Sequence, residues 1–474
     1  MKKILKQEKK NSGPPNRMND LPYSDWMKFQ KSFDFFEDDG SLYFKYITFF
    51  TKRTEKNRRS LVCIIYPKCD LNELENRTER KIVIKDADQI QLSRTHYKYL
   101  IVDLRNRFKN IREYNYFIKH ELDIIFKYII NNVEDGKYFT FFIEDYISNT
   151  HMYPLSWALS YFGRKYARLT DEKIYISDEV NGEGQYSFSC VTFHNIKDER
   201  IPDYELFIPS TKASSEKIKF PRWIIPKPVP REKGVLLHPA KFPETIIGKF
   251  LNIFSPEDGI IFDPMCGTGS TQIACLRTKR NSIGFELEEQ YVNIAKQRIA
   301  LERMQPSLFE SGNSASVFNL NAVDSKSYNR IKNKSIDYCI TSPPYWDVLR
   351  SKGSEYQRGR RKNNLPTYYS ENENDLGNIK DYSDFILKLA DVYELTRPKL
   401  KDLSYMTIIV KNILKNRIQY NLAWDIVVEM EKRGYQFDGY TLWCQDDISM
   451  KPFAVGILWV SNTVHHYCLN FRKS

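Results

Sequence analysis

A rigid corner follows a strongly apolar segment in "DYCITSPPYWD", residues 337–347. The segment before the corner is typical of a buried strand, and two consecutive prolines, Pro343 and Pro344, end it. Because proline fixes its own backbone torsion, the Pro343 carbonyl and the neighbouring Ser342 hydroxyl are held as acceptors in a set direction. Tyr345 adds a ring that can stack on a planar group. Taken alone, a Pro-Pro-Tyr segment is more often an exposed extended turn or a ligand of a peptide-binding module, so the function of this corner depends on its surroundings.

A second group of candidate residues lies in the turn "FDPMCGTGSTQIA", residues 262–274. Gly267 and Gly269 remove side chains where the backbone turns tightly, so a ligand can approach the amide groups at the start of the following helix. Asp263 ends the strand before the turn, and Glu286 ends the next strand. A carboxylate at the position of Glu286 can accept hydrogen bonds from both hydroxyls of a ribose. The turn therefore predicts a site for a nucleoside-containing ligand.

Alternating strands and helices are expected to position this turn. The spacing of apolar residues predicts, in chain order, a helix, a strand, a helix, a strand and a helix over residues 245–254, 259–265, 270–280, 281–287 and 289–304. Strands that alternate with helices form a parallel sheet with right-handed connections. The sequence thus predicts an α/β fold with a doubly wound sheet.

Composition limits the class of protein. Hydrophobic residues make up 41% of the 474, and no apolar run approaches the ~20 residues of a membrane-spanning helix, so we expect a cytoplasmic protein. The eight cysteines form no CxxC pair and no His/Cys cluster at metal-ligand spacing, which predicts reduced thiols and no metal site. The net charge of +12 is a directional indication of a polyanionic partner such as nucleic acid.

Four motifs resemble, in the same order, those of the S-adenosylmethionine-dependent DNA amino-methyltransferases. They are HPAKFPE (238–244), IIFDPMCGTGST (260–271), GFELEEQYVNIAKQR (284–298) and TSPPYWD (341–347). The resemblance covers about residues 225–474, and NDLPYSDWMKFQKSF (19–33) is similar to a segment that often precedes the first motif. It implies a Rossmann-like methyltransferase fold, S-adenosyl-L-methionine as cofactor and double-stranded DNA as substrate. Met265 departs from the family, which usually has Phe there.

The resemblance also assigns the chemistry of the proline corner. An amino group on a nucleic-acid base is a poor nucleophile because its lone pair is delocalised into the ring, so acceptors must draw its hydrogens away. The family's catalytic motif matches Ser342, Pro343, Pro344 and Tyr345, and the tyrosine ring can stack on a base flipped out of the duplex. The serine form of the motif is commoner on cytosine enzymes, which favours N4 of cytosine over N6 of adenine.

Two further sets of site residues follow from these motifs and their surroundings. The expected cofactor-binding residues are Phe242, Asp263, Pro264, Gly267, Gly269, Glu286 and Asp324. The expected DNA-binding residues are Trp346, Arg358, Arg360, Arg361 and Lys362. Between residues 347 and 362 the sequence has six Lys and Arg against two acidic residues, and a basic segment beside a base-binding corner predicts phosphate contacts. A core position for Phe242 and a solvated loop position for Asp324 are the alternatives.

Closely spaced prolines in residues 220–239 predict a domain boundary. We expect a basic flexible tail over 1–18, an N-terminal α/β domain over 19–220 and the catalytic methyltransferase domain over 221–474. Methylation of RNA bases is an alternative function. A non-enzymatic nucleic-acid-binding protein is disfavoured, because the glycine turn and the proline corner are both intact. A restriction endonuclease partner and the oligomeric state are left open.

The N-terminal part of the sequence contains a weak match to the catalytic part. Residues 138–175 align without a gap with residues 405–442, and eight positions are identical. The identical pairs include Trp157/Trp424 and Asp171/Asp438. The same comparison places "YKYLIVDLRNRF" (97–108) where the strand and the proline corner lie in the catalytic part. We predict that residues ~40–215 form a degenerate methyltransferase-like domain for DNA recognition or for pairing with the catalytic half; an unrelated α/β recognition domain is the alternative.

Overall fold

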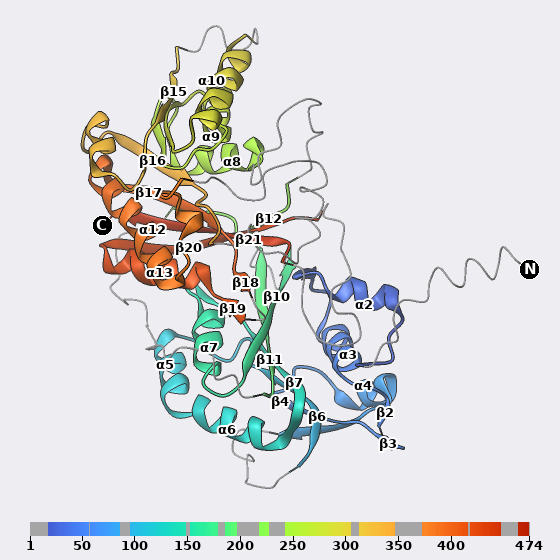
Figure 1. Ribbon diagram of the computed structural model, residues 1–474. Helices are drawn as coiled ribbons and strands as arrows, with labels where there is room; N and C mark the ends of the chain where they lie inside the picture. Colours follow the sequence, from blue (N-terminus) through green and yellow to red (C-terminus); the bar gives the residue numbers. More distant parts are fainter. Residues whose placement is uncertain are drawn as a thin grey trace, which may run out of the picture.

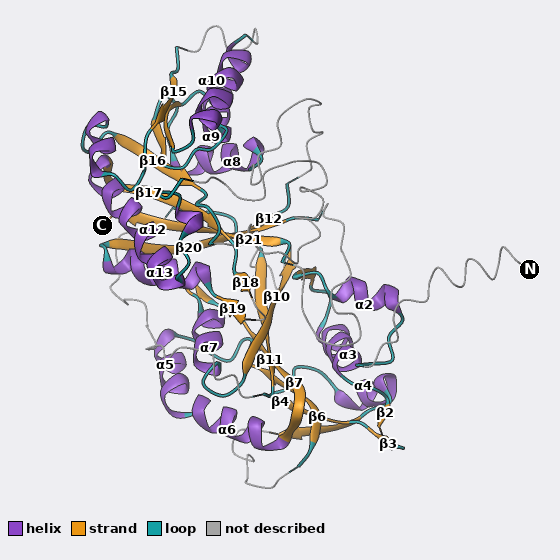
Figure 2. Ribbon diagram, in the orientation of Figure 1, coloured by secondary structure: helices purple, strands orange, loops and turns teal. Residues whose placement is uncertain are grey.

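The computed structural model contains two large β-sheets, each flanked by helices, in two lobes that lie one above the other in Figure 1. Figure 2 shows helices on both sides of each sheet. The structure describes residues 18–55, 57–85, 95–147, 152–178, 185–196, 218–226, 242–304, 312–346, 372–415, 418–446 and 463–473. In these ranges, no helix is long and apolar enough to cross a membrane.

The N-terminal lobe is built on a seven-stranded sheet. Its strands are, in spatial order, β1 (Phe33–Phe35), β10 (Arg168–Ser177), β11 (Tyr186–His194), β7 (Val133–Ile143), β6 (Tyr97–Asp103), β4 (Leu61–Ile65) and β5 (Lys81–Lys85). The strands from β7 to β5 run parallel, and β11 lies antiparallel to both of its neighbours. At the other edge, β1 runs parallel to β10.

The C-terminal lobe repeats this arrangement in an eight-stranded sheet. Its strands are, in spatial order, β12 (Trp223–Ile224), β20 (Tyr435–Cys444), β21 (His465–Lys473), β17 (Leu400–Val410), β16 (Ile336–Thr341), β13 (Ile260–Asp263), β14 (Asn281–Glu286) and β15 (Ala315–Asn319). The pairing directions match those of the first sheet strand by strand, and β15 is an additional edge strand. The doubly wound fold predicted from the sequence is therefore confirmed, and the N-terminal lobe shares its strand order.

The two sheets also match in register. In each lobe a tyrosine on the central strand donates a hydrogen bond of 2.6 Å to a threonine on the next strand, Tyr99 to Thr140 and Tyr338 to Thr407. From β10 onward the gapless sequence alignment is wrong by one residue. It paired Asp171 with Asp438, whereas strand pairing matches Asp171 with Gly439. The C-terminal lobe has one more residue between its helix and this strand, which an alignment without gaps cannot accommodate.

Helices cover both sheets. In the N-terminal lobe they are α2 (Tyr23–Phe29), α3 (Asp39–Phe50), α4 (Leu71–Thr78), α5 (Ile111–His120), α6 (Leu122–Asn132) and α7 (Leu155–Gly163). In the C-terminal lobe they are α8 (Glu244–Phe254), α9 (Ser270–Arg277), α10 (Glu289–Arg303), α12 (Tyr382–Thr396) and α13 (Leu422–Lys432), with the 3-10 turns η3 (Ser325–Arg330), η4 (Leu376–Asn378) and η5 (Arg397–Lys399). Small two-stranded ribbons are β2 (Thr54–Glu55) with β3 (Arg58–Arg59), β8 (Tyr146–Ile147) with β9 (Met152–Tyr153), and β18 (Ile413–Lys415) with β19 (Ile418–Tyr420).

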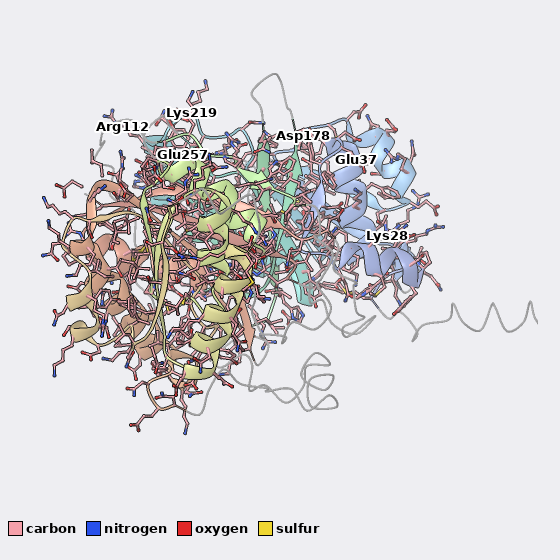
Figure 3. The ribbon with its side chains drawn as sticks, turned by 90° about the horizontal axis from the view of Figure 1, so that it is seen from above. Lys28, Glu37, Arg112, Asp178, Lys219 and Glu257 are labelled. Atoms are coloured by element: carbon pink, nitrogen blue, oxygen red, sulfur yellow. The ribbon has the colours of Figure 1, made fainter. Side chains whose placement is uncertain are left out.

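The two lobes share apolar packing. One cluster of buried side chains contains Trp157 and Ile174 of the N-terminal lobe together with Trp424 and Tyr467 of the C-terminal lobe. Charged side chains lie at the outside, as Lys28, Glu37 and Glu257 show in Figure 3. The lobes are thus joined through buried apolar side chains, among them Trp157 of α7 and Trp424 of α13.

Candidate active site

The glycine turn connects β13 to α9 at the carboxyl edge of the second sheet. Gly267 and Gly269 both have positive φ, at 53° and 80°, a conformation that favours glycine. A Cβ atom on Gly269 would lie 3.0 Å from the Cβ of Ala295 on α10, so the turn packs too closely for a larger residue. Gly269 is also the N-cap of α9, which leaves the first amides of this helix available to a ligand.

Asp263 ties the turn to the strand that carries the proline corner. Its carboxylate accepts hydrogen bonds from Thr271 Oγ1 of α9 at 2.6 Å, from Thr341 Oγ1 of β16 at 2.8 Å and from the Met265 amide at 3.1 Å. Burial raises the pKa of Asp263 to about 6. The residue predicted to bind the cofactor therefore also fixes the two halves of the site relative to each other.

Glu286 lies at the end of β14, as the sequence predicted, with its carboxylate held by the backbone. Its Oε2 accepts from the Gly267 amide and its Oε1 from the Glu288 amide, each at 2.9 Å. Burial raises the pKa of Glu286 to about 7. Since each carboxylate oxygen has a second lone pair, both oxygens can still accept a hydroxyl from a ligand.

A single cleft joins the glycine turn to the proline corner. It encloses about 1070 Å³ of empty space, part of it open to solvent, and is lined at one end by the turn and Glu286 and at the other by Ser342, Pro343 and Pro344. Phe242 and Pro264 also line it, and Phe242 packs at the same time against the ring of Trp443, with 5.3 Å between the ring centroids. The cleft therefore brings the glycine turn and the proline corner into one continuous site.

Lys411 is a site residue that the sequence analysis missed. It follows β17 directly, and its Nζ atom lies 5.6 Å from the centroid of the Tyr345 ring. Burial lowers the pKa of Lys411. The available signal was a lysine placed immediately after the apolar end of a strand, Ile408–Val410, which puts an amino group at the same sheet edge as the proline corner.

Trp346 was predicted to contact DNA, and the structure argues for a different role. The side chain is 5% exposed, and its ring lies 5.0 Å from the Tyr382 ring and 4.9 Å from the Tyr420 ring. The Lys415 ammonium sits over it at 3.7 Å from the ring centroid. We therefore correct the assignment, because a ring enclosed by two tyrosines and a lysine supports the corner from behind.

Asp324 is likewise not where the cofactor prediction put it. The residue is exposed, and its carboxylate caps η3 by accepting from the Lys326 amide at 3.0 Å. The adjoining residues Asn321, Ala322 and Val323 line the cleft instead. The capping role turns the Asp324 side chain toward its own helix, so the alternative of a solvated loop position is the correct one.

The basic residues predicted to bind phosphates, Arg358, Arg360, Arg361 and Lys362, lie outside the described residues. The chain resumes at Asn372, and Asn374, Asp375 and Leu376 line the cleft. Sequence reasoning had no reason to single out these three residues, because a long polar segment separates them from the proline corner.

Comparison with known proteins agrees with the geometry of this site. The family model N6_N4_Mtase, described as DNA methylase, matches residues 17–297. The Type II methyltransferase M.ScaI of Streptomyces caespitosus is 40% identical over 65 residues, which are 14% of this chain and 21% of that protein. The Type II methyltransferase M2.MboI of Moraxella bovis is 29% identical over 102 residues, 22% of this chain and 37% of that protein.

The chain thus spans less than two fifths of the length of each of these relatives. Among solved structures, an rRNA methylase from Streptococcus thermophilus is 13% identical, with 49% of this chain and 98% of that chain covered at a TM-score of 0.28.

Proposed function

This chain belongs to the DNA methylase family, whose model matches more than half of it, and from that premise we propose that it transfers a methyl group to the exocyclic N4 of a cytosine flipped out of double-stranded DNA. The observation that carries the proposal is the single cleft that joins the glycine turn to Ser342, Pro343 and Pro344. A methyl donor in one end of the cleft and an amino group in the other end are then adjacent.

The methyl donor of this family is S-adenosyl-L-methionine, and the residues of the cleft fit it. Gly267 and Gly269 have positive φ and no side chain in the turn, and Glu286 presents two oxygens that suit the hydroxyls of a ribose. Phe242 offers an apolar surface beside them. When bound, this cofactor supplies a methyl group on a positively charged sulfur, which is a good leaving group.

The proline corner would prepare the amino group for attack. Ser342 Oγ and the Pro343 carbonyl accept its two hydrogens, which draws the nitrogen toward tetrahedral geometry and frees its lone pair. Tyr345 stacks on the base, and stacking on an aromatic side chain contributes about 1–3 kcal/mol per base. This offsets the few kcal/mol that extracting a base costs. No cysteine lies in this motif, so the carbon–nitrogen bond would form directly as the carbon–sulfur bond of the donor breaks, and the amino group would then release one proton.

The choice of base is tested by expressing the full chain in a host free of DNA methylation and digesting the host DNA to nucleosides for mass spectrometry. We expect N4-methylcytosine with the wild type and none with Ser342→Ala. Asp324→Ala, which lies outside the cleft, is the matched control and should modify DNA like the wild type. N6-methyladenine would replace the proposed base, modified bases in RNA alone would favour the RNA alternative, and no modification would overturn the function.

Contacts between DNA phosphates and the basic segment are part of the proposal. Reversing the charge of Arg360 and Arg361 together should weaken DNA binding and flatten its salt dependence, because each phosphate contact releases counterions. The measurement is the affinity for a DNA duplex at several salt concentrations. An unchanged slope would mean that these arginines are only part of a solvated surface.

A further inference from the structure

The two lobes meet through contacts that repeat when the lobes are exchanged. Asp145 follows β7, and Asn412 follows β17 at the matching position. Asp145 Oδ2 accepts from the Tyr440 hydroxyl at 2.6 Å, and Asn412 Nδ2 donates to Glu172 Oε2 at 3.3 Å. The strand registers place Tyr440 of β20 and Glu172 of β10 at matching positions. Each contact is therefore the counterpart of the other, with the lobes reversed.

The reciprocity extends to the helices behind these residues. Asp145 Oδ1 accepts from the Ser156 amide of α7 at 3.0 Å, and Asn412 Oδ1 accepts from the matching Ala423 amide of α13 at 3.2 Å. The ribbon strand β9 contacts β20, and its counterpart β19 contacts β10. Figure 1 shows α7, β10 and the β18–β19 ribbon together between the lobes.

Trp157 of α7 and Trp424 of α13, a matching pair, meet edge to face with 6.2 Å between their rings. A residue that meets its own counterpart marks the centre of a two-fold interface, in which each partner uses the same surface. The two lobes are thus related as the subunits of a two-fold dimer are.

In the N-terminal lobe, the described side chains that follow β6 are packed closely at the corner that matches the proline corner. Asp103 lies in the register of Ser342 and is fully buried, where it pairs with Arg105 and accepts from the Tyr43 hydroxyl at 2.7 Å. The Arg105 guanidinium lies 4.7 Å from the centroid of the Phe188 ring. A buried ion pair and aromatic rings therefore fill the place that the open cleft occupies in the other lobe.

We propose that the N-terminal lobe takes the place of a second, inactive subunit and that Glu172 and Arg164 are positioning residues for the catalytic corner. Arg164 donates to the Gln419 carbonyl and, at 3.2 Å, to Asn421 Oδ1. With the Glu172 contact to Asn412, these bonds hold the segment behind the corner, residues 411–415 and 418–421. The role in catalysis rests on the proposed function.

This segment touches the corner at two places. Its first residue, Lys411, faces the ring of Tyr345, and Tyr420 packs against Trp346 with 4.9 Å between the rings. A shift of the segment would therefore move the residue that stacks on the base and the residue that supports it. Small displacements of reacting groups reduce rates strongly, by about a hundredfold for 1 Å.

The two-fold relation supplies a matched pair of variants. Glu172→Ala leaves the Asn412 amide and the Ser189 hydroxyl, which donates to Glu172 Oε1 at 3.0 Å, without this acceptor. Asp145→Ala leaves the Tyr440 hydroxyl and the Ser156 amide without theirs. Each change removes one hydrogen bond across the same interface and one inside the N-terminal lobe, but only Glu172 holds the segment behind the active corner.

The test compares kcat and KM of the full-length variants on genomic DNA from a methylation-free host. We expect Glu172→Ala to lower kcat by about ten- to a hundredfold and to leave KM for S-adenosyl-L-methionine within about twofold. Asp145→Ala should lower Tm by about as much as Glu172→Ala does, but should leave kcat within about twofold of the wild type. Equal losses of kcat would overturn the positioning role. If Glu172→Ala does not fold, the partly exposed Arg164→Ala replaces it, with an expected decrease in kcat and an unchanged Tm.

Hydrogen exchange separates this inference from the proposed function. Glu172→Ala should speed amide exchange in residues 411–415 and 418–424, and Asp145→Ala should speed it in residues 144–147 and 152–158. A wild-type protein that methylates nothing would contradict the proposed function. The exchange pattern would still test whether each lobe holds the matching segment of the other. Unchanged exchange in residues 411–415 and 418–424 of Glu172→Ala would overturn the positioning role of Glu172.

Discussion

The corner after β6 and the corner after β16 begin from the same structure and end in opposite states. Both follow a central parallel strand whose tyrosine, Tyr99 or Tyr338, is hydrogen-bonded to a threonine of the next strand. After β16 the chain opens into a cleft at Ser342. After β6 it closes over the buried ion pair of Asp103 and Arg105. The strands of the two sheets share the same fold, and the few residues that follow the strand ends determine whether a cleft forms.

The neighbouring strands differ in the same way. Strand pairing puts Ile64 of β4 where β13 has Asp263, the residue that ties the glycine turn to β16. Residues 66–78, which follow β4, contain no glycine. The position of the anchoring carboxylate is thus apolar in the N-terminal lobe, and Tyr66, with φ of 58°, stands in the turn after β4 where the other lobe has glycines. The two lobes therefore differ at the turn as well as at the corner.

The largest effect should come from opening the closed corner. Asp103→Ala leaves the Arg105 guanidinium, 3% exposed, without its closest partner, and breaking a buried ion pair costs about 3–5 kcal/mol. Urea unfolding should show this loss, while the methylation rate per folded molecule stays within about twofold. Asp39→Ala, which removes a partly exposed partner of Arg105, is the matched control and should cost about 1 kcal/mol or less.

A folded Asp103→Ala protein that had lost methyl transfer would give the N-terminal corner a part in the chemistry. The comparison of the two corners would then be wrong, because it assigns chemistry to one of them alone.

The open corner should show the reverse behaviour. Ser342→Ala should lower kcat by about 10²–10³-fold, by analogy with removal of one preorganised hydrogen-bonding group from a catalytic site. Stability and the affinity for S-adenosyl-L-methionine should change little, because no hydrogen bond of the described structure that holds the turn involves Ser342. Single-turnover kinetics and calorimetry measure the two quantities. A matching loss of cofactor affinity would place Ser342 in the cofactor site.

The fold was predictable from the sequence where patterns are local. Alternating strands and helices predict the parallel part of the second sheet, because each element carries its own apolar period. The fold of the N-terminal lobe required comparison of the chain with itself, since its turn and corner have lost their motifs. The one-residue error at Asp171 arose because an added residue in the α13 region leaves no mark in a gapless alignment.

The site was predictable where its residues are close in sequence. The turn and the corner carry their own signals, glycines with positive φ and a proline pair, and both line the cleft. Lys411 was missed because β17 brings it to Tyr345 from a distant part of the chain. The assignment of Trp346 failed because its burial by Tyr420 depends on tertiary structure. The assignment of Asp324 failed because its carboxylate makes a local capping bond to the Lys326 amide.

Substitution of Glu286, beside the glycine turn of the C-terminal lobe, should have an intermediate effect on cofactor affinity. The Glu286 pKa of about 7 in the free protein should fall when ribose hydroxyls donate to the ionised carboxylate, so binding releases a proton at lower pH. The affinity for S-adenosyl-L-methionine should therefore rise with pH up to about 7 and level off above it. Glu286→Gln should weaken binding by about ten- to a hundredfold, since a hydrogen bond to a charged acceptor contributes about 1.5–3 kcal/mol.

Calorimetry at several pH values checks this prediction. In Glu286→Gln the change of affinity near pH 7 should disappear, and any step that persists at lower pH belongs to Asp263, whose pKa is about 6. A wild-type affinity that is flat between pH 6 and 8 would show that Glu286 does not hold the ribose.

The smallest effect should come from Asp324, which directly follows the cleft-lining residue Val323 but does not line the cleft. Asp324→Ala removes the cap of η3, and loss of an N-cap typically costs about 1 kcal/mol. Because the carboxylate points to the Lys326 amide, the affinity for S-adenosyl-L-methionine should stay within about twofold of the wild type. Asn321→Ala, which changes a residue that does line the cleft, is the matched variant and should weaken binding more than it weakens the fold. If calorimetry shows that Asp324→Ala weakens cofactor binding more than Asn321→Ala does, the adenine end of the cofactor lies against η3. The open site would then extend beyond the cleft as far as η3.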